Sequence, residues 1–317
     1  MQIVLICLNV WWFDKKDLIM LFQPLKESDL DLLKKYLPQY GDGDCDLSLV
    51  SLFSRGIHSH FRYFEYESSH LVLERQVGRD SFPVFVMPIG KEETPFSLFE
   101  ALDHYTRQNH RPLRFYGRTD SMAPILAKAF PHRKLIIEDN PNRWDYVYAC
   151  SDFVELPGSH FHSKRNFVKR FYKACPDAQF EVYTKDRFNG CMAFLNDWYS
   201  GREMNESLLE EKAAIEKVLK HWEELPVYGG ILQEHGRILG LTYGARSASD
   251  ILAVHIEKAT RDVPGAYPAL SQAFAKSLPL CIEYLNREED LGIPGLRKAK
   301  QDWHPITQLK KGVIEVQ

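Results

Sequence analysis

Hydrophobic residues in the first 130 positions recur at both helical and strand spacing. Leu30, Leu33 and Leu37 fall on one face of a helix, and the turn Glu67-Ser68-Ser69 separates two apolar runs. The predicted elements are a helix at 30–37, a hairpin of strands 61–66 and 71–74, a strand at 82–89, a helix beginning at 95, a strand at 112–116 and a helix at 122–130.

The second half has a clearer order of elements. Val168, Phe171 and Cys175 lie on one helical face, and Asn205 is placed to cap a further helix that ends near Trp222. The predicted elements are helices at 162–175 and 205–222, a three-strand antiparallel meander at 227–233, 238–245 and 251–257, a helix over 270–278, a strand at 281–285, a helix at 295–301 and an extended segment at 307–316.

This order resembles that of the GCN5-related acetyltransferase fold and predicts an α/β (α+β) protein. Residues 131–143, with two prolines and many charges, are predicted to connect two lobes.

The composition limits the kinds of partner and the cellular compartment that fit this chain. A chain of 317 residues with 44% hydrophobic residues can bury a large core, and its formal charge of −3 means that any polyanion site must be a local patch. The six cysteines are scattered, which favours reduced thiols and a cytoplasmic location. The apolar start, residues 1–13, is too short to span a bilayer.

A basic segment precedes Cys175. Residues 160–175 contain no acid, and Arg165, Lys169 and Lys173 lie on one helical face although like charges at that spacing cost about 0.2–0.5 kcal/mol per pair. Two interpretations stay open: a face that binds a polyanion through Lys164, Arg165, Asn166 and Lys169, or a solvated helix face.

A second candidate region spans residues 286–300. Three acids, from Glu288 to Asp290, precede a Gly-x-Pro-Gly turn and a helix start, where free N–H groups suit an anion. Arg297 and Lys300 would add charge-assisted contacts, and the carboxylates would bind an amine or act as a base. The alternative is a tight turn held by internal ion pairs such as Glu289–Arg297.

A third candidate is the end of the last meander strand. Strict alternation would place His255 and Glu257 on one face, which makes Glu257 a candidate base or amine binder unless that face meets solvent. We expect Glu257 to lie within about 10 Å of segment 289–297, the scale of a small-ligand pocket.

Two stretches of sequence argue against acetyl-CoA binding and against a metal site. The loop where acetyl-CoA-binding members carry Gln/Arg-x-x-Gly-x-Gly/Ala here runs from Arg261 to Ala266, and Pro264 replaces the first glycine and has no N–H to donate. The pairs His58/His60 and His160/His162 have no third ligand at a suitable spacing, so no metal site is predicted.

Several of these stretches together resemble one family. The segments are Asp145-Tyr146-Val147-Tyr148, Leu156-Pro157-Gly158, Lys164-Arg165-Asn166, His255-Ile256-Glu257-Lys258-Ala259 and the block from Asn286 to Lys300 followed by His304-Pro305, with Met87-Pro88-Ile89-Gly90 upstream. On these the chain is identified as a member of the phosphatidylglycerol lysyltransferase C-terminal domain family, in its stand-alone soluble branch.

The resemblance implies two tandem acetyltransferase-like lobes, similar to the Fem peptidyl transferases. It begins at Met20, so 1–19 is expected to lie outside the fold, with lobes at 20–135 and 145–317 and the site in the second. Membrane-bound relatives move an amino acid from aminoacyl-tRNA to a lipid head group.

The expected function is therefore acyl or aminoacyl transfer from aminoacyl-tRNA or acyl-CoA to an amine or hydroxyl, with a small molecule, peptide or lipid head group as acceptor. Glu257, Glu289 and Asp290 are the candidate catalytic residues, and the expected contacts to substrate or phosphate come from Lys164, Arg165, Asn166, Lys169, His255, Asn286, Arg297 and Lys300. The alternatives are a CoA-dependent N-acetyltransferase and a non-catalytic module that binds a metabolite or tRNA.

Overall fold

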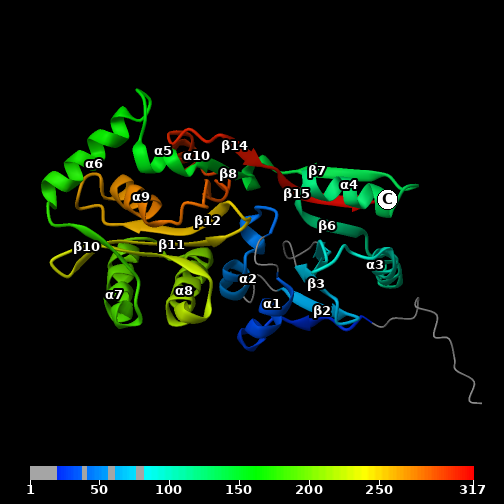
Figure 1. Cartoon of the computed structure of the whole chain (residues 1–317). Helices are drawn as coiled ribbons and strands as arrows, with labels where there is room; N and C mark the ends of the chain where they lie inside the picture. Colours follow the sequence, from blue (N-terminus) through cyan, green and yellow to red (C-terminus); the bar gives the residue numbers. More distant parts are fainter. Residues whose placement is uncertain (1–19, 38–40, 56–60, 76–81) are drawn as a thin grey trace, which may run out of the picture.

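The computed structural model describes residues 20–37, 41–55, 61–75 and 82–317. The predicted extension 1–19 and the pair His58/His60 lie outside the described residues. Within those ranges the chain forms two mostly antiparallel sheets flanked by helices, so the predicted α/β class is confirmed (Figure 1).

The first sheet belongs mainly to the N-terminal half. Its order is β1-β2-β3-β4-β6-β15-β7, with β5 paired to β3. The strands are β1 (Gln23–Pro24), β2 (Arg62–Tyr66), β3 (His70–Arg75), β4 (Val84–Val86), β5 (Ile89–Gly90), β6 (Leu113–Arg118), β7 (Leu135–Asp139) and β15 (Lys311–Val316), and the helices of this half are α1 (Leu30–Tyr36), α2 (Leu49–Arg55), α3 (Phe96–Gln108) and α4 (Thr119–Ala129).

The second sheet has the order β14-β8-β13-β12-β11-β10-β9. Helices α7 and α8 cover one face, and α9 lies on the other (Figure 1). The strands are β8 (Asp145–Ala149), β9 (Gln179–Val182), β10 (Val227–Glu234), β11 (Arg237–Arg246), β12 (Ile251–Ala259), β13 (Tyr284–Asn286) and β14 (Thr307–Leu309), and the helices are α5 (Cys150–Glu155), α6 (His162–Ala174), α7 (Phe188–Tyr199), α8 (Glu206–Lys220), α9 (Ala266–Ser277) and α10 (Pro294–Gln301).

One strand, β15, is exchanged into the sheet of the other half. β8 follows β7 in the chain and lies between β13 and β14 of the second sheet. β15 follows β14 but lies between β6 and β7 of the first sheet, where the red end of the ribbon enters it (Figure 1). The second lobe, expected to run to residue 317, therefore contributes its last strand to the first sheet.

One hydrophobic core also joins the halves. Leu52 and Phe53 of α2 belong to the same buried cluster as Ile215 and Leu219 of α8. Each such side chain contributes about 1.5–3 kcal/mol when it is fully buried. The packing of α2 on α8 thus fixes the loop before α2 against the second sheet.

A divergence of strands creates space in the second sheet. β12 pairs in parallel with β13 only from Ile251 to Ala253. β12 then continues to Ala259, whereas the chain leaves β13 after Asn286. The last six residues of β12 therefore have a neighbouring strand only on the β11 side, since β11 pairs along them.

Several boundaries differ from the predicted ones. The supposed connection 131–143 contains β7, because residues 135–139 pair with β15 from the far end of the chain. Strand 82–89 is broken at Pro88 into β4 and β5, as expected for a residue without an N–H. The predicted segment 307–316 is two strands in different sheets, and β13 is shorter and later than predicted. The meander and the Asn205 cap are confirmed.

Candidate functional site

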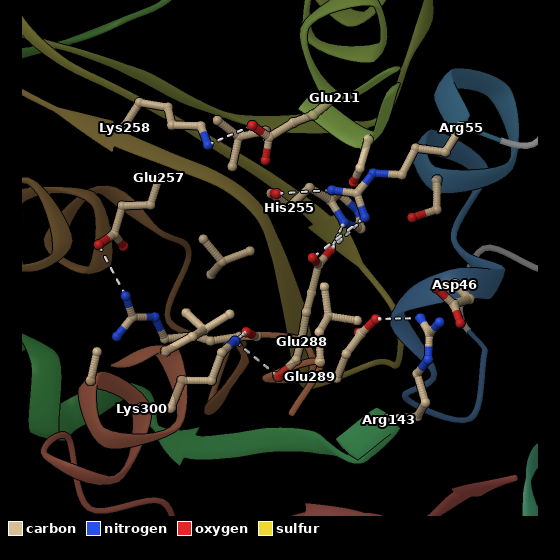
Figure 2. Close-up of a pocket in the computed structure, with 18 of the residues that line it drawn as sticks. Asp46, Arg55, Arg143, Glu211, His255, Glu257, Lys258, Glu288, Glu289 and Lys300 are labelled. Carbon is tan, nitrogen blue, oxygen red and sulfur yellow. Dashed lines mark hydrogen bonds and ion pairs between the residues drawn. The ribbon is translucent and has the colours of Figure 1, made fainter. Parts of the chain in front are cut away.

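A cavity of about 720 Å³ lies where β12 leaves β13, and it is also walled by α2, α8, α10 and the loop before α2 (Figure 2). Its lining contains seven basic and seven acidic side chains, so it suits a ligand with both charges rather than a simple anion. The basic residues are Arg55, Arg75, Arg143, Lys164, Lys258, Arg287 and Lys300; the acidic ones are Asp46, Glu210, Glu211, Glu257, Glu288, Glu289 and Asp302.

A β-bulge aims the side chains of β12 into this cavity. Tyr243 pairs with Ile256 and Gly244 pairs with Val254, which leaves His255 as the extra residue. A bulge interrupts strict alternation and redirects neighbouring side chains, and bulges recur beside active sites. The predicted sharing of one face by His255 and Glu257 is therefore too simple, since Ile256 and Lys258 line the cavity as well.

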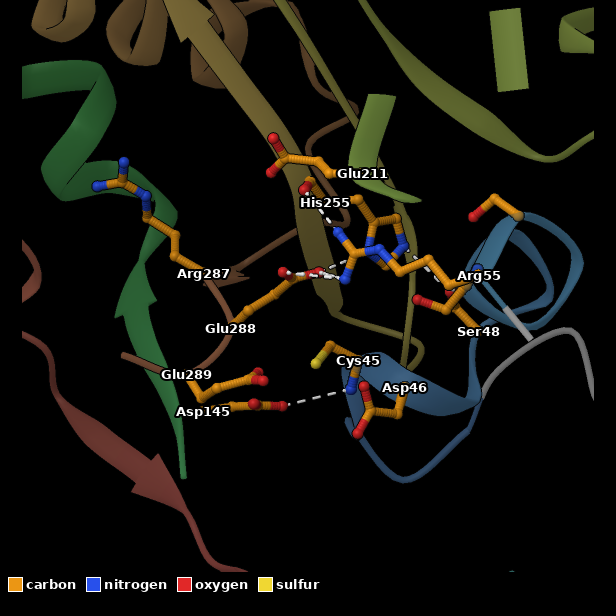
Figure 3. A network of polar contacts seen from close by, with 12 residues as sticks. Cys45, Asp46, Ser48, Arg55, Asp145, Glu211, His255, Arg287, Glu288 and Glu289 are labelled. Atoms are coloured by element: carbon orange, nitrogen blue, oxygen red, sulfur yellow. Dashed lines mark hydrogen bonds and ion pairs between the residues drawn. The ribbon is translucent and has the colours of Figure 1, made fainter. Parts of the chain in front are cut away.

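His255 is held in a fixed orientation at the cavity floor (Figure 3). Its Nδ1 lies 2.9 Å from Glu288 Oε1, and its Nε2 lies 3.0 Å from Ser48 Oγ. An ionised carboxylate only accepts, so Nδ1 donates to Glu288, while Nε2 shares a hydrogen bond with the serine hydroxyl. Both ring nitrogens are thus occupied, and His255 orients Glu288.

Glu288 is a fixed anion. The Arg55 guanidinium lies 3.4 Å from Glu288 Oε2. Burial by itself would raise the pKa of Glu288, but Arg55 and the His255 hydrogen bond lower it to about 2. Its backbone has φ of 59°, a strained conformation for a residue other than glycine, and such strain clusters at functional sites.

Glu289 meets a buried lysine from the exchanged strand. Lys311 Nζ is fully buried and lies 2.8 Å from Asp145 Oδ1, 3.3 Å from Asp46 Oδ2 and 3.7 Å from Glu289 Oε2. Arg143 lies 3.3 Å from Glu289 at the cavity side. Burial raises the pKa of Glu289; Lys311 opposes this, and the neighbouring carboxylates add to it, so the net shift is upward.

Two further ion pairs lie along β12 (Figure 2). Glu257 accepts from Arg287 at 3.0 Å and from Ser271 Oγ at 2.8 Å. Lys258 donates to Glu211 at 2.7 Å, and burial lowers the pKa of this lysine against the effect of Glu211. Along β12 the cavity therefore presents charges that are already paired and positioned.

Five of the eleven predicted site residues line the cavity. Lys164 lies over the Trp303 ring at 4.8 Å. Lys300 is buried, which lowers the pKa of its amine, and it donates to the Arg287 and Glu288 carbonyl oxygens. The five are Lys164, His255, Glu257, Glu289 and Lys300.

The other six lie elsewhere in the structure. Asp290 is fully buried and accepts from Arg297 Nε at 2.7 Å, an arrangement that holds the turn before α10. Asn286 is buried and its amide donates to Asp145 at 2.9 Å. Arg165 donates to the carbonyl oxygens of residues 156 and 158. Asn166 contacts His162, and Lys169 is exposed. These residues support the turn, the sheet or the surface of α6.

Sequence reasoning missed the contribution of the N-terminal half. Ser48, Arg55 and Asp46 come from the loop and helix at 44–55, about 200 positions from β12. No local pattern links them to the site. Glu288 was part of the predicted acidic run, but its contacts to His255 and Arg55 depend on the fold and its positive φ, which the sequence does not reveal.

Carboxylates and Cys45 form groups with metal-ligand spacing among the described residues. Asp44, Cys45 and Asp46 form one, and Cys45, Asp145 and Glu289 form another, each with ligand atoms within 4.8 Å of one another. The Lys311 ammonium lies among both groups and already supplies a cation there.

The start of α9 is covered by α6. The backbone of α6 approaches Gly265 so closely that a Cβ atom built on this glycine would lie 2.0 Å from the Phe167 carbonyl oxygen. Pro264 has no N–H, so this loop offers one donor fewer at the place where acetyl-CoA-binding members hold pyrophosphate. Elsewhere in the described ranges, none of the helices combines the length and apolar character needed to traverse a bilayer.

The chain belongs to the family described as phosphatidylglycerol lysyltransferase, C-terminal, whose profile matches residues 38–312. A conserved protein of unknown function from Bacteroides thetaiotaomicron is 28% identical with a TM-score of 0.83, over 94% of this chain and 100% of that one. No curated protein matches.

Two solved structures from the lysyltransferase group share the fold. The C-terminal domain of a putative lysylphosphatidylglycerol synthetase from Agrobacterium fabrum is 15% identical with a TM-score of 0.62, and L-PGS from Bacillus licheniformis is 14% identical with a TM-score of 0.60. Each comparison covers 92% of both chains. The chain is thus a transferase-family protein with this two-sheet fold.

Proposed function

We propose that the chain is an aminoacyl- or acyltransferase that uses aminoacyl-tRNA as donor and an amine or hydroxyl as acceptor. The observation that carries the proposal is Glu289, a nearly buried carboxylate that opens onto a cavity with charges of both signs. Family membership supports the reaction class. The five described cysteines are free, which fits a cytoplasmic setting where charged tRNA is made.

The proposed step is a single acyl transfer. The acceptor nitrogen or oxygen attacks the ester carbonyl carbon, its new bond to carbon forms, and the bond from carbon to the donor oxygen breaks. Glu289 takes the acceptor proton and returns it to the departing oxygen. The raised pKa of Glu289 suits this exchange better than the low pKa of Glu288, which stays ionised.

Other charges have positioning roles in this scheme. Glu288 and Glu257 offer fixed carboxylates to the ammonium group of an aminoacyl moiety or of an amine acceptor. Arg143, beside Glu289, is the nearest cation to the reacting carboxylate and can stabilise the developing oxyanion. On α6, Lys169 and Lys173 remain exposed and are proposed to attract the RNA.

The test is consumption of tRNA charged with a labelled amino acid, with candidate acceptors in a pool. Glu289→Gln should lower the transfer rate by about 100-fold or more, as expected for loss of a general base. Glu100→Gln, at an exposed position on α3, is the matched control. If wild-type protein consumes no charged tRNA yet retains it in a binding assay, the non-catalytic module is correct instead.

A further inference from the structure

A second cavity of about 510 Å³ lies beside the first. It is bounded by α7, the β10–β11 turn and the loop that follows β12. Arg202, Arg237 and Arg261 reach it from these three separate segments. We call it the arginine cavity.

Three arginines and two aspartates line the arginine cavity, and two of the arginines already have partners there. Arg202 lies flat on the Trp198 ring, with its guanidinium carbon 3.6 Å from the ring centroid, and its Nε donates to the Trp198 carbonyl oxygen at 3.3 Å. Arg237 pairs with Asp262 at 3.2 Å, and Asp197 also lines the wall. A guanidinium fixed in this way loses little side-chain entropy when it binds a planar pair of phosphate oxygens.

The cavity also has room for a ligand. A Cβ atom built on Gly201 or on Gly236 would meet nothing within 4 Å. Both glycines lie in the lining, beside Arg202 and Arg237. The backbone at these points is therefore open to close approach by an incoming group.

Only one layer of side chains separates the two cavities. Trp198 lines the arginine cavity, and its Nε1 donates to Tyr267 Oη at 3.0 Å. Tyr267 and Lys258 line the first cavity, and Lys258 Nζ lies 4.1 Å from the Trp198 ring centroid. The two cavities are thus close neighbours, with Trp198, Tyr267 and Lys258 between them.

We infer that the arginine cavity binds the phosphate groups of a nucleotide-bearing donor, whose acyl end occupies the first cavity. This inference rests on the proposed transfer function and adds the position of the donor's phosphates. They would lie on the α7 side of the sheet, because on the other side α6 packs against the start of α9 and Pro264 has no N–H to donate.

The experiment measures binding to the full chain by calorimetry, with three probes: inorganic pyrophosphate, coenzyme A and an RNA hairpin ending in CCA. The double variant Arg202→Gln/Arg261→Gln should weaken binding by about tenfold or more, because it removes two charge-assisted contacts. Lys128→Gln, exposed on α4, is the control and should bind like wild type.

A third variant is expected to bind the probes more tightly than wild type, and a misfolded protein would not do so. Asp197→Asn removes an opposing charge and should tighten binding of the same probes. Binding of RNA alone identifies the donor as RNA, and binding of coenzyme A identifies a CoA thioester. The inference is overturned if no probe binds at millimolar concentration, or if the double variant binds like wild type. Glu289→Gln should keep full binding, which separates this result from failure of the transfer step.

Discussion

The two sheets have the same order of elements but differ in the length of one strand. In both, a meander is followed by a helix and then a parallel strand: β4 and β6 in the first sheet, β12 and β13 in the second. β4 has three residues and lies in an apolar core with β6. β12 has nine, and its last six extend beyond β13 into the charged cavity.

The difference in strand length shows how the same topology forms a closed apolar core in one sheet and a cleft for functional side chains in the other. A strand no longer than its parallel partner leaves no gap, whereas a strand that continues past it opens a cleft whose walls are free for functional side chains. The first half still takes part, because Arg55 lines that cleft and Ser48 hydrogen-bonds to His255 of β12. The first sheet in turn holds β15, which carries Lys311.

The largest expected effect concerns the exchanged strand. Lys311→Met removes the ammonium from the fully buried Asp145 and from the partly buried Asp46 and Glu289, and breaking a buried pair costs about 3–5 kcal/mol. The melting temperature should fall by about 10 °C. Lys310→Met, at the exposed neighbouring position, should change it by less than about 2 °C. Equal melting temperatures would show that the exchange does not depend on this ion cluster.

The second prediction concerns the pH dependence of transfer. A base must be ionised to accept a proton, so the rate should rise with pH through the pKa of Glu289 and level off above it. Because that pKa is raised, the midpoint should lie above the value of about 4.3 for an ordinary glutamate. Single-turnover rates measured across pH give the profile. A profile unchanged in Glu289→Gln would exclude this residue as the base.

A smaller effect is expected at Asp44, between the two sheets. Burial raises the pKa of Asp44 to about 8, despite Lys311 at 3.7 Å. The folded protein thus binds an extra proton between about pH 4 and pH 8, and stability from this group is lost as pH rises through that range. Asp44→Asn should therefore gain most in melting temperature over wild type at pH 9. Asp31→Asn, fully exposed on α1, should show no such trend.

The basic helix α6 carries one arginine with a structural role, Arg165, and an exposed lysine, Lys169, that is proposed to bind RNA. Arg165→Gln should lower the melting temperature by about 2–4 °C through loss of its two carbonyl contacts, roughly 1 kcal/mol in total. Lys169→Gln should leave stability unchanged and flatten the salt dependence of tRNA binding. Replacement of Lys164, Arg165 and Lys169 together should weaken tRNA binding most. Equal binding at low salt by this triple variant would mark the helix as a solvated face.

The smallest effect is expected at the start of the chain. Deletion of 1–19 should leave the melting temperature within about 2 °C, because the core of the described residues already begins at Met20 and Phe22. A drop of about 10 °C would show that this segment belongs to the fold.

Short sequence patterns predicted the elements whose formation depends on neighbouring residues in the chain. The three meander strands follow from alternating apolar residues between short turns, and the helix after Asn205 follows from its cap. The bulge at His255 could not be predicted, because it is defined by pairing with β11. The Ser48–His255 contact joins residues 207 positions apart. The acidic run at 288–290 indicated a site, but its backbone turn decides which carboxylate meets the cavity.

The most direct test of the account is a crystal structure with an aminoacyl-adenosine analogue in which an amide replaces the ester. The account predicts that the carbonyl group lies in the cavity beyond the β12–β13 pairing, with an acceptor-side water or amine about 3 Å from the Glu289 carboxylate. An analogue bound against the first sheet, or in the second with Glu289 facing away from it, would contradict the claim that this divergence of strands is where transfer occurs.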